Sequence, residues 1–347
     1  ASLPTLGSPG KRLEHALYRP RHVALIADRA LETAALLARN LVGGGFKGRL
    51  SAVGMTAAGL EAAASVAALP QPLDLAVLAV PAERVERILG DLGATGCRAA
   101  VVPGLAPDLA ASASRTGMAV LGEGSFGICV PGIGLNASLT HLPPRPGRLA
   151  LVSQSSAIAR AVIDWAEAEA VGFSHVIGIG TNAGLGFAHA LDWLARDPGT
   201  GAIILDVRRI RNRRMFVSAA RAAARSRPVV AIRAGARVGD PSGVAEAVMD
   251  AALRRAGVLP VVGLEDLLSA AETLARVRLS TRGGPGDRIA VVGNAAGLAG
   301  LAADAVLAGG ARLAETAEGN PVVLGPGAGA ALGEAAARLA AIRGVDA

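Results

Sequence analysis

Short apolar runs alternate with stretches of helical periodicity along most of the chain. Between the runs, amphipathic stretches such as Leu31–Leu41 and the segment that follows Pro81 predict helices, and a further alanine-rich helix is expected between Val53 and Leu73. Continuous apolar strands separated by helices are typical of a parallel sheet covered on both faces. The pattern therefore predicts a Rossmann-like unit over residues 1–142. Its strands are expected at His22–Asp28, Arg49–Val53, Leu73–Val80, Arg98–Gly104 and Met118–Gly122.

The pattern restarts after the proline-rich stretch Leu142–Gly147, which reads as a linker by composition. A second parallel-sheet unit is expected over residues 147–279, and a glycine-rich break at Ser280–Asp287 precedes a third start at Arg288. That last unit, residues 287–347, holds too few strands for a complete sheet, so it is either reduced or cut short. Strands of the second unit are expected at Arg148–Gln154, Phe173–Gly180, Ala202–Val207, Pro228–Gly235 and Val258–Gly263.

Composition excludes several classes of protein. The 347 residues are 52% hydrophobic, too apolar for a disordered chain, and no uninterrupted apolar run reaches the roughly 18 residues that a membrane span needs. The net charge of +7 could indicate a nucleic-acid partner, but of the 35 basic residues only Lys11 and Lys47 are lysines, which resembles codon bias. With Tyr18 the only tyrosine, we expect no platform for stacking bases and no nucleic-acid partner.

The two cysteines, Cys97 and Cys129, fit neither a disulfide framework nor a zinc site, because they lie far apart without a CxxC motif or a neighbouring histidine. Cys97 is expected to be a buried thiol. With no apolar signal core at the N-terminus, a reducing, cytoplasmic setting is expected, and no metal site. None of the five histidines has a Ser or Asp partner nearby in the sequence, so each is expected to be structural or exposed.

Ser153-Gln154-Ser155-Ser156 lies between a predicted strand and a predicted helix start. Free backbone N–H groups and the helix dipole favour an anion there, so the serine hydroxyls could bind a phosphate. Alternatively, one serine simply caps the helix.

Three further segments follow predicted strand ends, where sites in such sheets lie. Gly180-Thr181-Asn182 could face the same pocket as the serine loop, or be only a tight turn. Glu123 and Ser125, in Gly122–Gly127, could lie near the interdomain cleft, or Glu123 could be merely solvated. The arginines of Arg208–Arg214 could cradle phosphates, or form a solvated helix start. After the first strand, Asp28-Arg29-Ala30 lacks the glycines of a dinucleotide fingerprint, which disfavours NAD.

Four blocks of the sequence occur in a recognisable order: RPRHVALIAD, LDLAVLAVPAERV, PRPGRLALVSQSSAIARAVIDWAEAEAVGFSHVIGIG and RRMFVSAARAAARSRPVVAIRAGAR. Together they resemble the ADP-forming acyl-CoA synthetase (acetate–CoA ligase) family, a relative of the succinyl-CoA synthetase α subunit. They look closest to the synthetase-like region of Pat-type protein lysine acetyltransferases. The resemblance implies a CoA-binding Rossmann-like domain followed by flavodoxin-like ligase domains. It also implies CoA contacts at three turns, which comprise Ala27, Asp28 and Arg29, then Val80, Pro81 and Ala82, then Ser153, Gln154 and Ser155.

The departures from that family bear on activity. The family phosphorylates a histidine in an SHTGA-type loop, but the corresponding stretch Gly235–Gly243 contains none, so the phosphoryl relay lacks its nucleophile. The family's acidic residue after the third strand of the second domain falls at Arg208, and the fourth position of its SQSG loop at Ser156. No ATP-grasp domain and no acetyltransferase-type pyrophosphate loop is visible in the sequence.

Three hypotheses follow. The first is a CoA- or acyl-CoA-binding module without catalytic residues of its own, a regulatory or degenerate part of an acyl-CoA synthetase or protein acetyltransferase. The second is an active α-type subunit of an ADP-forming acyl–CoA ligase that needs a separate ATP-grasp partner. The third is a structural or homo-oligomeric scaffold with an empty cleft.

Overall fold

The computed structural model describes residues 9–106, 109–182, 184–235, 238, 242–277 and 287–346, with side chains from residue 13 onward. Contacts divide the chain into two compact units, Ala1–Arg276 and Val277–Ala347. Both larger sheets lie within the first unit. The domain boundary expected at residue 142 therefore stays a prediction.

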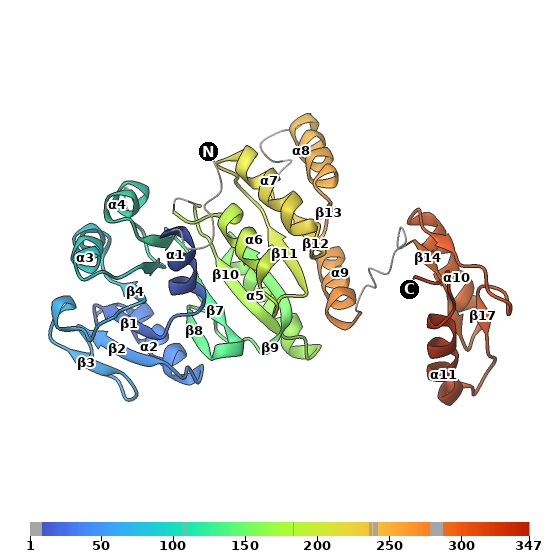
Figure 1. Ribbon diagram of the computed structural model, residues 1–347, viewed down its shortest axis with the longest axis horizontal. Coiled ribbons are helices and arrows are strands. Elements are labelled where there is room, and N and C mark those ends of the chain that lie inside the picture. Colours follow the sequence, from blue (N-terminus) through green and yellow to red (C-terminus); the bar gives the residue numbers. More distant parts are fainter. Residues whose placement is uncertain are drawn as a thin grey trace. The chain divides into compact units, whose positions relative to one another are not determined.

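The first sheet has six parallel strands in the order β3-β2-β1-β4-β5-β6 (Figure 1). Every strand expected in this part of the chain is present. The alanine-rich helix expected between Val53 and Leu73 is wrong: the segment forms β3 and a 3-10 turn, and two glycines in it, Gly54 and Gly59, have positive φ. The elements are α1 (Pro9–Tyr18), β1 (His22–Ala27), α2 (Glu32–Gly43), β2 (Arg49–Val53), β3 (Glu61–Ala63), η1 (Val66–Ala68), β4 (Leu75–Ala79), α3 (Ala82–Ala94), β5 (Ala99–Val102), α4 (Leu109–Thr116) and β6 (Ala119–Gly122).

The second sheet has the strand order β13-β12-β11-β9-β10-β7-β8. The five strands from β13 to β10 in this order are parallel to one another, as expected. Strands β7 and β8 form an antiparallel hairpin, in which Cys129 pairs with Val176 of β10. Residues 127–138 therefore belong to the second sheet, although they precede the linker. The elements are β7 (Gly127–Val130), η2 (Pro131–Ile133), β8 (Leu135–Ser138), β9 (Pro146–Ser153), α5 (Ser156–Ala168), β10 (Phe173–Gly178), α6 (Phe187–Arg196), β11 (Ala202–Asp206), α7 (Arg213–Ala224), β12 (Val229–Ile232), α8 (Val244–Arg255), β13 (Val258–Val261) and α9 (Leu264–Arg276).

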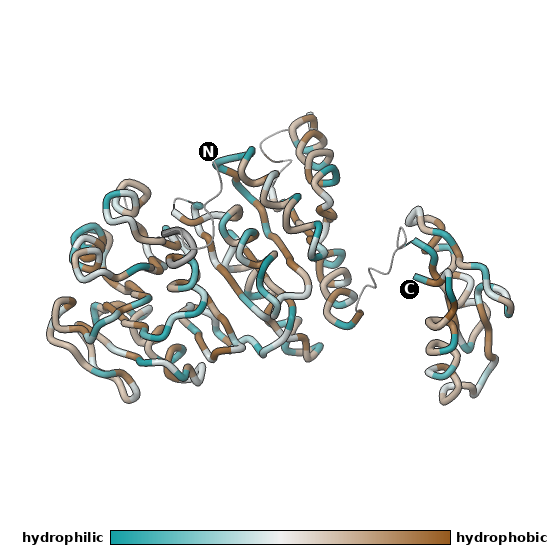
Figure 2. Tube along the Cα trace, viewed as in Figure 1, coloured by the Kyte–Doolittle hydropathy of each residue, from teal (hydrophilic) through white to brown (hydrophobic). Residues whose placement is uncertain are grey.

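Small aliphatic side chains form the core. Strands β1, β4, β5 and β11 are buried at every residue, which agrees with parallel sheets covered on both faces (Figure 2). One cluster of buried residues runs from Leu17 of α1 through both sheets to α6 and α7, so a single apolar layer joins the two sheets. Cys97 is buried and unpaired as expected, and burial raises the pKa of its thiol to about 12.

The second unit is small in its described part. Two short parallel strand pairs, β14 with β16 and β15 with β17, are accompanied by two helices. The strand start at Arg288 and the helix that follows it are confirmed. The elements are β14 (Arg288–Ile289), β15 (Val292–Gly293), α10 (Ala296–Ala308), β16 (Arg312–Leu313), β17 (Val322–Val323) and α11 (Gly329–Ala340).

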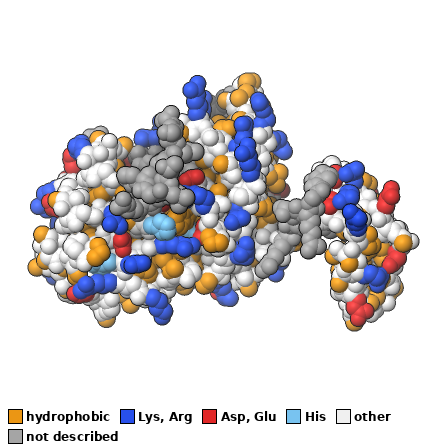
Figure 3. Space-filling view, viewed as in Figure 1, with side chains coloured by type: hydrophobic (Ala, Val, Ile, Leu, Met, Phe, Trp, Pro, Cys, Tyr) orange, Lys and Arg blue, Asp and Glu red, His pale blue; other side chains and the backbone are white. Residues whose placement is uncertain are grey.

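The described residues contain neither a membrane-crossing helix nor a cluster suited to a metal ion. None of their helices combines the length and the apolar character that crossing a bilayer requires. No group of three or more His, Cys, Asp or Glu side chains within the described ranges could hold a metal ion. On the face drawn in Figure 3, Lys and Arg side chains are spread among neutral and apolar ones and do not form a single stripe.

Candidate ligand site at the carboxyl ends of the strands

The residues expected to form a site all follow the carboxyl ends of strands. Two turns belong to the first sheet's central strands, a third loop follows its edge strand β6, and two more follow β9 and β10 of the second sheet. In open α/β sheets ligands bind outside these ends. In chain order the residues are Ala27, Asp28, Arg29, Val80, Pro81, Ala82, Glu123, Ser125, Ser153, Gln154, Ser155, Ser156, Gly180, Thr181 and Asn182.

The turns after β1 and β4 are held together through Asp28. Its backbone N–H donates to the carbonyl oxygen of Ala79 at 2.7 Å, and its carboxylate pairs with Arg84 of α3 at 3.1 Å. Ala27 and Val80 are buried, Pro81 is the N-cap of α3, and Ala82 is its first residue. The two turns therefore lie against each other, with the Asp28 carboxylate already engaged.

Arg29 is a cation available at the turn after β1. Its side chain is exposed, and it has no hydrogen bond or ion pair with any described residue. The neighbouring helix α2 begins with Glu32, whose negative charge disfavours an anion at the start of that helix. At this turn Arg29 is therefore better suited to a phosphate than the N-terminus of α2 is.

The serine loop caps its helix. Ser155 is the N-cap of α5, and its hydroxyl accepts a hydrogen bond from the backbone N–H of Ile158 at 3.3 Å. Ser156 opens α5 and is exposed. The capping alternative is thus realised at Ser155.

Asp206, at the end of β11, is a residue that the sequence analysis missed. Its Oδ2 accepts hydrogen bonds from the hydroxyl of Ser153 at 2.7 Å and from the backbone N–H of Ser155 at 3.0 Å. The residue is fully buried, and burial raises the pKa of its carboxyl. A carboxylate therefore already occupies the start of α5 where an anion was expected.

Gln154 connects three strand ends. Its Nε2 donates to the carbonyl oxygen of Gly180 at 3.1 Å, and its Oε1 accepts the backbone N–H groups of Arg208 and Arg209, each at 2.8 Å. The loops after β9, β10 and β11 thus form one group. The expectation that the serine loop and the Gly180 turn lie together agrees with this geometry.

The loop after β6 joins that group through Thr181. The backbone N–H of Thr181 donates to the carbonyl oxygen of Glu123 at 2.8 Å, and its hydroxyl lies 3.3 Å from the Glu123 carboxylate. Ser125 is buried and bonds the carbonyl oxygen of Gly178, so its hydroxyl is engaged within the fold. Glu123 is therefore paired and only partly exposed.

Two small pockets adjoin this group. One, of about 370 Å³, is lined by Arg208, Arg209, Arg213 and Arg233, and Nε and Nη1 of Arg233 have no acceptor among the described residues. The other, of about 210 Å³, includes Asn182. Of the arginines expected to cradle phosphates, Arg208, Arg209 and Arg213 line one hollow.

Three of the histidines have a polar partner that is distant in the sequence. His22 Nε2 lies 2.8 Å from the hydroxyl of Ser51, His141 contacts Asp164, and His175 lies beside Asp197. Each partner stands more than 20 residues away in the sequence, so inspection of neighbouring positions could not find it.

Comparison with known proteins identifies the two sheets. A CoA binding domain model matches residues 23–131, and a model of the succinyl-CoA ligase like flavodoxin domain matches residues 146–274. The α subunit of acetate–CoA ligase [ADP-forming] I from Pyrococcus furiosus is 27% identical over 84% of this chain and 68% of its own length. The chain belongs to the ADP-forming acyl-CoA synthetase family.

Other members of this acyl-CoA synthetase family agree. Acetate–CoA ligase [ADP-forming] I from Archaeoglobus fulgidus is 31% identical over 64% of this chain, which spans 36% of that relative's length. The structure of a dinucleotide-forming acetyl-coenzyme A synthetase 1 from Ca. Korarchaeum cryptofilum, in complex with phosphate and ADP, superposes with a TM-score of 0.81 at 25% identity. That match covers 91% of this chain and 76% of the other. The expected order, a Rossmann-like CoA-binding domain followed by a flavodoxin-like ligase domain, is confirmed, whereas the likeness to Pat-type proteins stays a prediction.

Proposed function

We propose that this chain is a CoA- or acyl-CoA-binding α-type module that does not carry a phosphoryl group itself. In this proposal it regulates, or forms a degenerate part of, an acyl-CoA synthetase or a protein acetyltransferase. The observation that carries the proposal is the CoA binding domain match over residues 23–131, combined with a relay segment, Gly235–Gly243, that contains no histidine.

The strand ends support CoA as the ligand. The turns after β1 and β4 lie against each other, and Arg29 beside them has no partner among the described residues. A guanidinium in this situation is suited to a phosphate of the CoA nucleotide.

The start of α5 supports the absence of phosphoryl transfer. The resemblance implies that the family's phosphohistidine docks at this helix N-terminus, whereas here the backbone N–H of Ser155 already donates to Asp206. A phosphoryl group placed there would meet the negative charge of that carboxylate, in addition to lacking a histidine to carry it.

Isothermal titration of the full chain with CoA and with acetyl-CoA tests the proposal. We expect binding to the wild type and a roughly tenfold or greater loss of affinity in Arg29→Ala, since a charge-assisted hydrogen bond contributes about 1.5–3 kcal/mol. Arg87→Ala is the matched control, because Arg87 is also exposed but lies one helical turn into α3. An absence of heat at millimolar ligand would overturn the proposal.

A second candidate is an active α-type subunit that works with a separate ATP-grasp chain. The observation in its favour is that the chain spans 68% of a relative that is itself named as a subunit α. This candidate predicts that labelled ATP, with an ATP-grasp subunit of the family present, places label on this chain. Absence of label on any residue would remove it.

A further inference from the structure

A pocket of about 860 Å³ lies at the amino ends of the strands, at the edge of the sheets opposite to the site described above. Arg21 and Gly48, which line it, directly precede β1 and β2 of the first sheet. Pro146 belongs to β9 of the second sheet, and Ser174 and His175 belong to β10. Volumes of this size accommodate organic molecules and exceed the space that a single inorganic ion needs.

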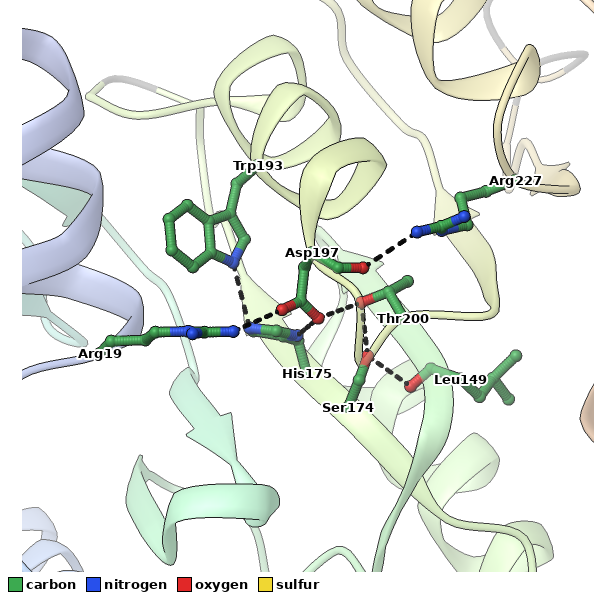
Figure 4. A network of polar contacts seen from close by, with 8 residues as sticks. All are labelled: Arg19, Leu149, Ser174, His175, Trp193, Asp197, Thr200 and Arg227. Atoms are coloured by element: carbon green, nitrogen blue, oxygen red, sulfur yellow. Dashed lines mark hydrogen bonds and ion pairs between the residues drawn. The ribbon is translucent and has the colours of Figure 1, made fainter. Parts of the chain in front are cut away.

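The floor of this pocket is a rigid polar network (Figure 4). Asp197, 5% exposed, accepts a hydrogen bond from Arg19 Nη2 at 2.8 Å on one carboxylate oxygen and from the Thr200 hydroxyl at 2.9 Å on the other. Arg227 Nη2 donates to its backbone carbonyl oxygen at 3.2 Å. The Asp197 charge is therefore balanced by Arg19 within the fold.

His175 leaves one donor unused on that floor. Trp193 Nε1 donates to His175 Nε2 at 3.2 Å, and since an indole N–H can only donate, Nε2 is the acceptor. Burial of the ring, which is 3% exposed, lowers the pKa of His175 to about 4, so the imidazole is neutral near pH 7 and carries its proton on Nδ1.

That Nδ1–H has no acceptor among the described residues. Asp197 Oδ2 is 3.9 Å away, beyond hydrogen-bond distance. This Nδ1 atom is enclosed within the fold and faces the Asp197 carboxylate, so it belongs to the floor and does not reach into the pocket.

The rim and walls define the rest of the ligand. Arg21 and Lys47 are exposed at the rim, and neither side chain pairs with a described residue. The walls are apolar and comprise Phe46, Val130, Ile133 and Pro146. Because the single lining carboxylate is already paired with Arg19, the two rim cations give the pocket a net positive field.

We propose that this pocket binds a small organic anion, a carboxylic acid with an apolar body. The carboxylate pairs with Arg21 and Lys47, and the body packs on the apolar walls. The site is separate from the CoA site proposed above, and both ligands bind at the same time.

The probe is 4-hydroxybenzoate, and 4-hydroxybenzamide is its neutral counterpart. Isothermal titration of the full chain is expected to show binding of the acid and at least roughly tenfold weaker binding of the amide. The acid is expected to bind equally well to the chain saturated with CoA.

Substitutions at the rim keep the test independent of folding, because both side chains are exposed. The double variant Arg21→Met, Lys47→Met is expected to lose at least roughly tenfold in affinity for the acid, whereas Arg87→Met on α3 keeps it. The proposal is overturned by no binding at millimolar acid, by equal binding of the amide, or by unchanged affinity in the double variant.

Discussion

At the scale of single residues, Gly180 determines how closely the loops after β6 and β10 approach each other. Its φ is +53°, and a Cβ at this position would overlap the carbonyl oxygen of Glu123. The hydrogen bonds from Gln154 to Gly180 and from Thr181 to Glu123 both depend on this approach. The glycine is therefore required for the geometry of the candidate site.

Gly180→Ala is expected to lower the free energy of unfolding by about 1–3 kcal/mol, because the methyl group meets backbone that cannot move aside and the φ disfavours alanine. Urea unfolding measures this. Gly90→Ala is the control: Gly90 lies within α3 with no atom near its added Cβ, so that variant should be neutral or slightly more stable. Equal midpoints for wild type and Gly180→Ala would contradict the account.

His175 gives the protein a pH-dependent stability. Its pKa is lowered to about 4 in the folded state from an ordinary 6.5, so between these values the unfolded chain binds more protons. The stabilisation is complete above pH 6.5 and is lost as the pH falls toward 4. Burial lowers the pKa of His22 as well, which acts in the same direction.

In His175→Gln, the urea midpoint should therefore fall less steeply between pH 7 and pH 4.5, although some fall should remain. This pH window is set by the ordinary and the folded pKa values of His175. His189→Gln is the matched control, since His189 is exposed on α6. The same pH slope in wild type and His175→Gln would show that the buried ring does not set the dependence.

At the scale of elements, the periodicity of the sequence was sufficient for the parallel strands and most helices, because buried strands and amphipathic helices differ in period and length. It could not assign the hairpin β7–β8 to a sheet, since the pairing of Cys129 with Val176 spans 47 positions. The contacts of Asp206 with the serine loop, and of His175 with Asp197, could not be predicted for the same reason. The residues of each contact are distant in the sequence and become neighbours only in the folded sheet.

The contact between α2 and the hairpin is a test at this scale. Asn40 Nδ2 donates to the carbonyl oxygens of Ser138 at 2.8 Å and Thr140 at 2.9 Å, and so ties the first sheet's helix to the second sheet. Asn40→Ala leaves both acceptors without this donor and should cost about 1–3 kcal/mol in urea unfolding. Arg39→Ala, exposed on the same helix, should leave the midpoint unchanged. A midpoint unchanged in Asn40→Ala as well would exclude this role.

At the scale of the whole molecule, the two sheets of residues 1–276 share one apolar cluster and present two edges with different chemistry. The residues of the carboxyl edge fall within the matched CoA-binding and ligase-like domains, yet the segment Gly235–Gly243 offers no histidine. The match to the family and the departures from it therefore have to be tested together.

Native mass spectrometry of the full chain, incubated with CoA, ATP, phosphate and an ATP-grasp subunit of the family, tests this central claim most directly. The account predicts a species heavier by one CoA and no species heavier by a phosphoryl group. A covalent phosphoryl adduct, or the absence of any CoA complex, would contradict it.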